Sequence, residues 1–289
     1  MRAFFIVLLS LLVGCQSLKQ ADTALNQKTE LAGVLADDPV THSSVAIIRV
    51  NALGVAESFC SATLVSSTAV LSAAHCFNEK NFKYFVLFST NFKQELGPIE
   101  NSPHAYAVRP SNLIIHPDYR IKRKRGTPDN DLALVKLDKP APSSYSPVPF
   151  VSESETLLEA ILHYDGIKSS VLKPGAPVIL AGYGVIDVDR RSTEGVLRKA
   201  NSFVNSVLRG EKKILLGPHP GRGACPGDSG GSAYADHGKG LVLVGVLAEA
   251  NCRGGGVKLV DVRQYSDWLS HNLGHPAHLT ASRETLPLR

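Results

Sequence analysis

Neither of the glycine patterns that cradle phosphates, G-x-G-x-x-G and the P-loop, occurs in this sequence, and no internal repeat is detectable. None of the five cysteines has the short paired spacing of a zinc site. The net charge is only +5, and a good part of the basic residues lies in the run Lys122–Arg125. We interpret this run as a solvated loop, with a docking site for an acidic partner as the alternative. We therefore expect no cofactor, no metal ion and no nucleic-acid partner.

Sustained helical spacing is also absent until residue 262. Short apolar runs rich in valine, leucine and isoleucine recur instead, separated by turn residues. The 289 residues include 24 glycines and 17 prolines, as expected for an all-β protein with many turns. The length allows one large domain or two small ones. The apolar runs lie at 43–50, 61–67, 69–74, 84–90, 132–137, 177–184, 213–217, 241–250 and 256–262.

Three segments depart from this strand pattern. Val262–Leu273 predicts an amphipathic helix, because four apolar side chains fall near one face. Residues 153–170 predict a surface insertion with a short helix. Residues 275–289 are interpreted as a loose tail. The four apolar residues of the predicted helix are Val262, Tyr265, Leu269 and Leu273.

The N-terminus predicts export. Arg2 precedes an apolar run that is too short to cross a hydrocarbon core of about 30 Å as a helix. Leu12–Cys15 resembles the bacterial lipobox, in which the cysteine is lipidated and becomes the first residue of the mature protein. An ordinary secretory signal with a chance cysteine is the alternative. We expect residues 1–14 to be a lipoprotein signal peptide. We also expect a cell-envelope lipoprotein of the outer membrane or periplasm, or its processed and released form.

The cysteine count supports this interpretation. An odd number of cysteines in an exported protein needs an explanation, and lipidation of Cys15 leaves four that can pair in an oxidising compartment. Four cysteines allow three connectivities, and free buried thiols are a further alternative. The four are Cys60, Cys76, Cys225 and Cys252.

Three stretches carry the chemistry: LSAAHC at 71–76, DNDLALVKL at 129–137 and CPGDSGGS at 225–232. A lone histidine is more often structural, and an acid before an apolar strand is often part of a turn. In this order along one all-β chain, however, the three stretches resemble the chymotrypsin/trypsin family of serine peptidases over roughly residues 43–273. The resemblance implies two six-stranded antiparallel β-barrels with a C-terminal helix. Residues 41–274 would then be the peptidase domain, 15–40 a tether or propeptide, and 275–289 a flexible tail.

The resemblance also implies the catalytic roles. Ser229 would be the nucleophile and His75 the base that takes its proton, since a serine hydroxyl is weakly nucleophilic at neutral pH. Asp131 and Asp129 compete as the acid that orients the histidine. We favour Asp131, because it directly precedes the apolar strand. The backbone N–H groups of Gly227 and Ser229 would form the oxyanion hole.

Family resemblance pairs the cysteines as Cys60–Cys76, at the histidine loop, and Cys225–Cys252, between the serine loop and the wall of the specificity pocket. It places that pocket around five small residues. The usual acid of trypsin-like members is replaced by glycine, so we expect a preference for small or apolar side chains. A buried arginine or lysine would have no partner there. The pocket residues are Gly223, Ala224, Ala248, Ala250 and Gly256.

Two carboxylates near the site carry further expectations. Glu249 lies where the family usually carries an aromatic residue; it is either an acid near the cleft or a side chain turned to solvent. Asp228 would bind the ammonium group freed when a propeptide is cut. The nearest match to the usual cleavage site is Leu31–Val34 after Glu30, and Lys122–Arg125 is a second candidate. Cleavage at the first site would separate the enzyme from a lipid on Cys15.

The sequence therefore predicts a monomeric serine endopeptidase with polypeptide substrates and possible membrane anchoring through Cys15. A protease-like binding protein that has lost activity is the alternative from a different class. A third interpretation, an envelope structural lipoprotein, leaves the serine motif unexplained.

Overall fold

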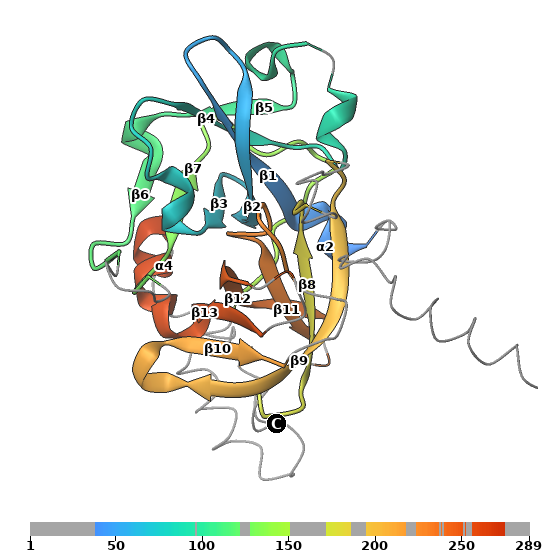
Figure 1. Cartoon of the computed structure of the whole chain (residues 1–289), viewed down its shortest axis with the longest axis vertical. Helices are drawn as coiled ribbons and strands as arrows, with labels where there is room; N and C mark the ends of the chain where they lie inside the picture. Colours follow the sequence, from blue (N-terminus) through green and yellow to red (C-terminus); the bar gives the residue numbers. More distant parts are fainter. Residues whose placement is uncertain are drawn as a thin grey trace, which may run out of the picture.

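The computed structural model describes residues 38–95, 97–121, 128–150, 172–185, 195–217, 224–236, 238, 240–250, 252 and 256–274. The predicted signal peptide, the cleavage candidates, the insertion at 153–170, Gly223 and the tail at 275–289 lie outside these residues. The described part forms two β units that lie one above the other in Figure 1. Among the described helices, none is both long and apolar enough to cross a membrane.

The N-terminal unit is a seven-stranded antiparallel sheet in the order β5-β4-β1-β2-β3-β7-β6. Its two edge strands, β5 and β6, are consecutive in the chain and are separated only by residues 109–112, which include the 3-10 turn η4 (Pro110–Asn112). The ends of the sheet therefore lie close together, and the sheet curls into an open half-barrel of seven strands, where the resemblance implied a barrel of six. Its strands are β1 (Ser44–Val50), β2 (Ala56–Ser66), β3 (Ala69–Ser72), β4 (Lys83–Leu87), β5 (Ala105–Val108), β6 (Leu113–Ile115) and β7 (Ala133–Lys136).

The C-terminal unit is a closed six-stranded barrel in the order β10-β13-β12-β11-β8-β9. Closure leaves no free edge, so the backbone of every strand is paired on both sides. Together the two units confirm the predicted all-β, chymotrypsin-like fold. The strands are β8 (Pro177–Gly182), β9 (Arg198–Leu208), β10 (Lys213–Leu216), β11 (Ser232–Asp236), β12 (Leu241–Glu249) and β13 (Val257–Asp261).

In the described part of the chain, short 3-10 turns and two helices connect and flank the barrels. The predicted C-terminal helix begins with a 3-10 turn, η6, and continues as the α-helix α4, which lies beside β6 and β7 in Figure 1. Three of its four predicted apolar residues are buried, and Leu273 packs against the same core. The elements are α2 (Pro39–Ser43), η1 (Ala74–Phe77), η2 (Phe92–Gln94), η3 (Ile99–Asn101), η5 (Arg209–Glu211), η6 (Val262–Tyr265) and α4 (Ser266–Leu273).

The N-terminal end of the described chain is packed onto the body. Asp38 caps α2 by accepting a hydrogen bond from the backbone N–H of Thr41 at 3.0 Å, and it forms an ion pair with Lys199 on β9. Val40 is buried in the hydrophobic core between the barrels. Asp38 and Val40, which lie inside the segment expected to be a tether, are therefore packed onto the body.

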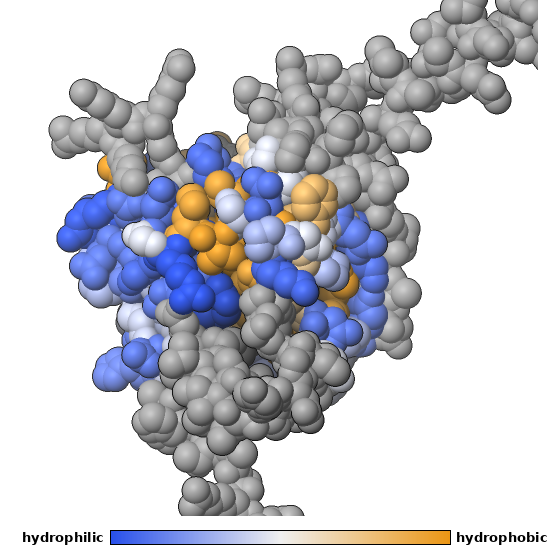
Figure 2. Space-filling model, turned by 90° about the horizontal axis from the view of Figure 1, so that it is seen from below, coloured by the Kyte–Doolittle hydropathy of each residue, from blue (hydrophilic) through white to orange (hydrophobic). Residues whose placement is uncertain are grey.

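The hydrophobic residues of the described part are largely buried. One core fills each barrel, and a third cluster, which contains residues from both barrels, includes the buried face of η6 and α4. Figure 2 shows one face of the molecule on which hydrophobic residues gather in the middle, bordered by hydrophilic residues. The large hydrophobic side chains that remain exposed in the described part are Leu53, Val55, Ile121 and Phe203.

Candidate active site

The N-terminal barrel brings His75 and Asp131 together. His75 lies in η1, directly after β3, and Asp131 lies just before β7, which pairs with β3. The imidazole Nδ1 is 2.7 Å from one carboxylate oxygen of Asp131, and the backbone N–H of His75 donates to the other oxygen at 2.9 Å. The carboxylate is fully buried, whereas about a quarter of the histidine side chain is exposed. The buried Asp131 carboxylate therefore fixes the position of the imidazole Nδ1, while part of the ring remains exposed to solvent.

Asp129, the competing acid, lies in the preceding turn. It exchanges backbone hydrogen bonds with Arg120, and its carboxylate is 3.8 Å from the amine of Lys213. Its side chain is 40% exposed, in contrast to the buried Asp131. The structure thus places Asp131, and not Asp129, beside the histidine.

The loop that carries Ser229 bridges the two barrels. The Ser229 carbonyl accepts a hydrogen bond from the backbone N–H of Ser61 on β2 at 2.8 Å, and the Ser61 hydroxyl donates to the Gly227 carbonyl at 2.9 Å. On the other side, the N–H of Gly230 donates to Leu247 on β12 at 2.7 Å. The loop around Ser229 is therefore tied by its backbone to both barrels. No motif in the sequence marked Ser61 for this role.

Gly230 shows how closely the barrels approach. It has a φ of +80°, and a Cβ atom there would overlap the Ser72 hydroxyl and the Ser61 carbonyl. Ser72 and Ala73 directly precede the histidine turn, and the Ser229 carbonyl lies 3.8 Å from the sulfur of Cys76. The absence of a side chain at Gly230 therefore lets the serine loop reach the histidine loop.

Within the described residues, no hydrogen bond joins the Ser229 hydroxyl to His75. Nucleophile–base hydrogen bonds are often long before substrate binds, and rotation of one serine torsion redirects the hydroxyl. In the same part of the chain, no acceptor binds the backbone N–H of Gly227 or of Ser229. Both amides therefore remain available to an oxygen atom of a substrate.

Asp228 is a second buried carboxylate, and its surroundings differ from those of Asp131. It accepts backbone N–H bonds from Gly184 at 2.7 Å and from Cys225 at 2.8 Å. Burial raises the pKa of Asp228 to about 7, and these two hydrogen bonds offset only part of that effect. No cationic side chain pairs with it among the described residues. The described surroundings of Asp228 therefore supply neutral hydrogen-bond donors and no counter-charge.

Two disulfides flank the site, joining Cys60 to Cys76 and Cys225 to Cys252, the pairs that the resemblance implies. The first links β2 to the histidine turn across a Cα–Cα distance of 6.2 Å. Its sulfurs lie within 4.8 Å of a His75 ring nitrogen, but a disulfide has no thiolate to bind a metal. The second disulfide joins the serine loop to the chain after β12.

The predicted pocket residues are only partly described, because Gly223 lies outside the described residues. Ala224 and Ala248 are buried, Ala250 packs partly against the C-terminal core, and Gly256 is exposed. Glu249 forms an ion pair at 3.1 Å with Lys258, its neighbour across β12 and β13. This ion pair matches the alternative in which the Glu249 carboxylate is turned to the surface.

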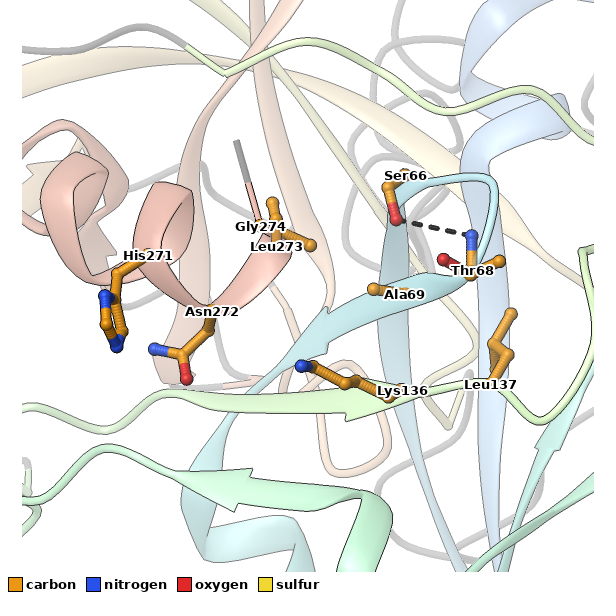
Figure 3. A pocket seen from close by; sticks show the side chains of 9 residues that line it. All are labelled: Ser66, Thr68, Ala69, Lys136, Leu137, His271, Asn272, Leu273 and Gly274. Carbon is orange, nitrogen blue, oxygen red and sulfur yellow. Dashed lines mark hydrogen bonds between the residues drawn. The ribbon is translucent and has the colours of Figure 1, made fainter. Parts of the chain in front are cut away.

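A cavity of about 400 Å³ lies apart from these residues, between the β2–β3 turn and the end of α4 (Figure 3). Lys136 and Asn272 extend toward the same space from the strand and the helix. None of the predicted site residues lines it. The lining residues are Ser66, Thr68, Ala69, Lys136, Leu137, His271, Asn272, Leu273 and Gly274.

Comparisons with known proteins agree with the family resemblance of the three sequence motifs. The sequence model of the family named Trypsin matches residues 38–269, about four fifths of the chain. Human kallikrein-4 is 30% identical over 226 residues, which cover 74% of this chain and 77% of that protein. Vitamin K-dependent protein C of the rabbit is 26% identical over 238 residues, which cover 74% of this chain and 46% of that protein.

Proposed function

The chain belongs to the trypsin family of serine peptidases, and on that premise we propose that it is an active endopeptidase that uses His75, Asp131 and Ser229. The observation that carries the proposal is the buried 2.7 Å contact between Asp131 and the histidine, beside the cross-barrel serine loop. An intact acid–base pair next to a serine has no evident use in a binding protein without activity.

In the proposed reaction, the Ser229 oxygen attacks the carbonyl carbon of the scissile peptide bond while His75 takes the hydroxyl proton. Asp131 keeps the imidazole in the tautomer whose Nδ1 carries a proton, and its charge stabilises the imidazolium that forms. His75 then gives the proton to the leaving amine, and the acyl-enzyme remains. Water, deprotonated by the same histidine, hydrolyses the ester and restores the serine.

The unbonded N–H groups of Gly227 and Ser229 support a role as the oxyanion hole. Both lie in the loop that the Ser61 hydroxyl and β12 hold in place, so they are preorganised before the reaction. Pro226 has no N–H group, but the proposed oxyanion hole takes no donor from that position.

We propose an uncharged specificity pocket that favours small or apolar side chains. Ala224 and Ala248 present buried methyl groups, and the nearest acid considered, Glu249, is paired with Lys258. An arginine or lysine side chain would therefore lose its hydration without gaining an ion pair. A peptide library tests this: cleavage after small or apolar residues is expected, and strong preference for arginine would contradict it.

We further propose that Asp228 receives the ammonium group of a processed N-terminus, with cleavage after Glu30 as the first candidate. Its raised pKa and neutral partners support this, because a buried carboxylate gains most from a cation. The two disulfides favour export, and Leu12–Cys15 supports a lipid anchor on Cys15 that this cleavage would release. N-terminal sequencing of the active form is the test; an active form that begins at Cys15 would refute release on activation.

The decisive test of activity is covalent labelling of the purified protein by a fluorophosphonate, after treatment with candidate activating proteases. We expect label on Ser229, and loss of both labelling and peptide hydrolysis by about 10⁴-fold or more in Ser229→Ala. Ser232→Ala, in the same segment but outside the proposed machinery, is the matched control and should label normally. A wild-type chain that never labels would favour the alternative of a binding protein without activity.

A further inference from the structure

The backbone around Asp131 forms an unusually tight turn. The N–H of Leu132 donates to the carbonyl of Asn130 at 2.8 Å, which closes a three-residue turn centred on Asp131. Asn130 itself has a left-handed conformation with a φ of +50°, which is uncommon for residues other than glycine. Such a conformation persists only where the surroundings hold it.

The Asp131 carboxylate depends on this turn for its position. Both of its oxygens accept hydrogen bonds from His75, and within the described residues no other group binds them. Since the side chain is short, its direction follows from the backbone at residues 130–132. The contacts that hold the backbone of Asn130 therefore also hold the Asp131 carboxylate in position beside His75.

Asn130 is held by its own side chain. The hydroxyl of Tyr265 donates to Asn130 Oδ1 at 2.8 Å, and Asn130 Nδ2 donates to the carbonyl of Asp118 at 2.9 Å. Asp118 lies in the connection between β6 and β7, but Tyr265 lies in η6, 135 residues further along the chain. The left-handed turn is thus clamped from the C-terminal segment.

Tyr265 is itself rigidly placed. Its ring is buried, and the His116 ring meets it edge-on at 5.1 Å and 87°. The amine of Lys212 lies 4.8 Å from the ring centre on its face. Burial, together with the acidic side chains around it, raises the pKa of Tyr265, so its hydroxyl keeps the proton that it donates to Asn130.

From this geometry we propose that Tyr265 is a positioning residue for catalysis: its hydroxyl holds Asn130 in the left-handed conformation that aims Asp131 at His75. The inference rests on the proposed peptidase function and deepens it. The hydroxyl touches neither substrate nor the reacting atoms, so removing it should weaken the chemical step and leave substrate binding unchanged.

The test is Tyr265→Phe, which removes one oxygen atom and keeps the ring. Its matched control is Tyr106→Phe, because Tyr106 is also buried and donates one hydrogen bond, to the carbonyl of Pro140 at 3.2 Å, away from the site. We expect kcat to fall about tenfold in Tyr265→Phe with KM unchanged, while Tyr106→Phe keeps the wild-type kcat. Equal kcat values in the two variants would overturn the proposal.

A second variant, Asn130→Gly, tolerates the same backbone conformation but lacks the side chain that Tyr265 binds. We expect it to lower kcat as Tyr265→Phe does, and the double variant to be no slower than the slower single one. Multiplicative effects would show that the two residues act independently and would refute the clamp. If Tyr265→Phe does not fold, the kcat of Asn130→Gly tests the clamp instead: a fall in kcat supports the proposal, and a wild-type kcat refutes it.

The outcomes separate the two proposals. If wild type and Tyr106→Phe both fail to hydrolyse peptides and to label at Ser229, the proposed function fails, and the positioning role with it. If both are active and Tyr265→Phe matches them in kcat and in labelling rate, only the positioning role fails.

Discussion

Each barrel contributes one buried aspartate to the site, and the two are held in opposite ways. Asp131, from the N-terminal barrel, lies against an imidazole that can become a cation. Asp228, from the C-terminal barrel, meets two neutral backbone amides, and burial raises its pKa to about 7. The N-terminal barrel thus holds an acid already paired with its base, whereas the acid of the C-terminal barrel meets no cationic side chain among the described residues.

The largest expected effect tests the first of these acids. Asp131→Asn should lower kcat by about 10⁴-fold, because the amide leaves the histidine in the wrong tautomer while the fold survives. The measurement is steady-state hydrolysis of a peptide substrate. Asp129→Asn is the matched control and should stay within about twofold of wild type, since that side chain lies in the exposed turn. Equal losses in the two variants would contradict the assignment of Asp131.

The next effect tests the second acid through pH. Because the folded-state pKa of Asp228 is raised from 3.8 to about 7, the folded chain binds a proton that the unfolded chain has released. This stability is fully present below about pH 4 and is lost as the pH rises to about 7, by roughly 4 kcal/mol in all.

Denaturant unfolding from pH 4 to 8 measures this loss. Asp228→Asn, which cannot titrate, should lack that part of the slope. In a processed form whose ammonium group binds Asp228, the slope should shrink as well. Identical slopes in wild type and Asp228→Asn would sink the idea that this carboxyl lacks a counter-charge.

A smaller effect tests the junction between the barrels. Gly230 and Gly54 share a φ of +80°, but only Gly230 is surrounded; a Cβ atom at Gly54 would meet nothing within 4 Å. Gly54→Ala should cost about 1–2 kcal/mol of unfolding free energy from backbone strain alone. Gly230→Ala should cost about 2 kcal/mol more and should also lower activity. Thermal unfolding and peptide hydrolysis check both, and equal costs would show that the close approach is unimportant.

The fold was predictable where burial left a clear mark on the sequence. Nine apolar runs coincide with strands, including β1, β7 and β12, because buried strands need such residues on one or both faces. Four strands have no matching run. β9 is polar along most of its length and is only partly buried. β5 and β6 are too short to show a period, and β11, although buried, is the short run SAYAD with a single large apolar side chain.

In the candidate site, the sequence predicted the proposed reacting groups and the two flanking disulfide pairs. The motifs named the histidine, the serine and two candidate acids, and chain order favoured one acid over the other. Ser61 and Tyr265 gave no such signal, since a serine in a strand and a tyrosine on a helical face have ordinary structural uses. Their roles depend on contacts between residues more than 130 positions apart, which no local pattern encodes.

Because Asp38 and Val40 pack on the body, the length of chain before Asp38 limits how far the peptidase domain can lie from a lipid anchor. If Cys15 carries a lipid, the 22 residues between Cys15 and Asp38 can span at most roughly 80 Å from the membrane surface. If the anchored form is active without cleavage after Glu30, it would reach only proteins within that distance of the membrane. In that case, shortening this segment should reduce the distance over which proteins are cut, without changing the peptidase domain.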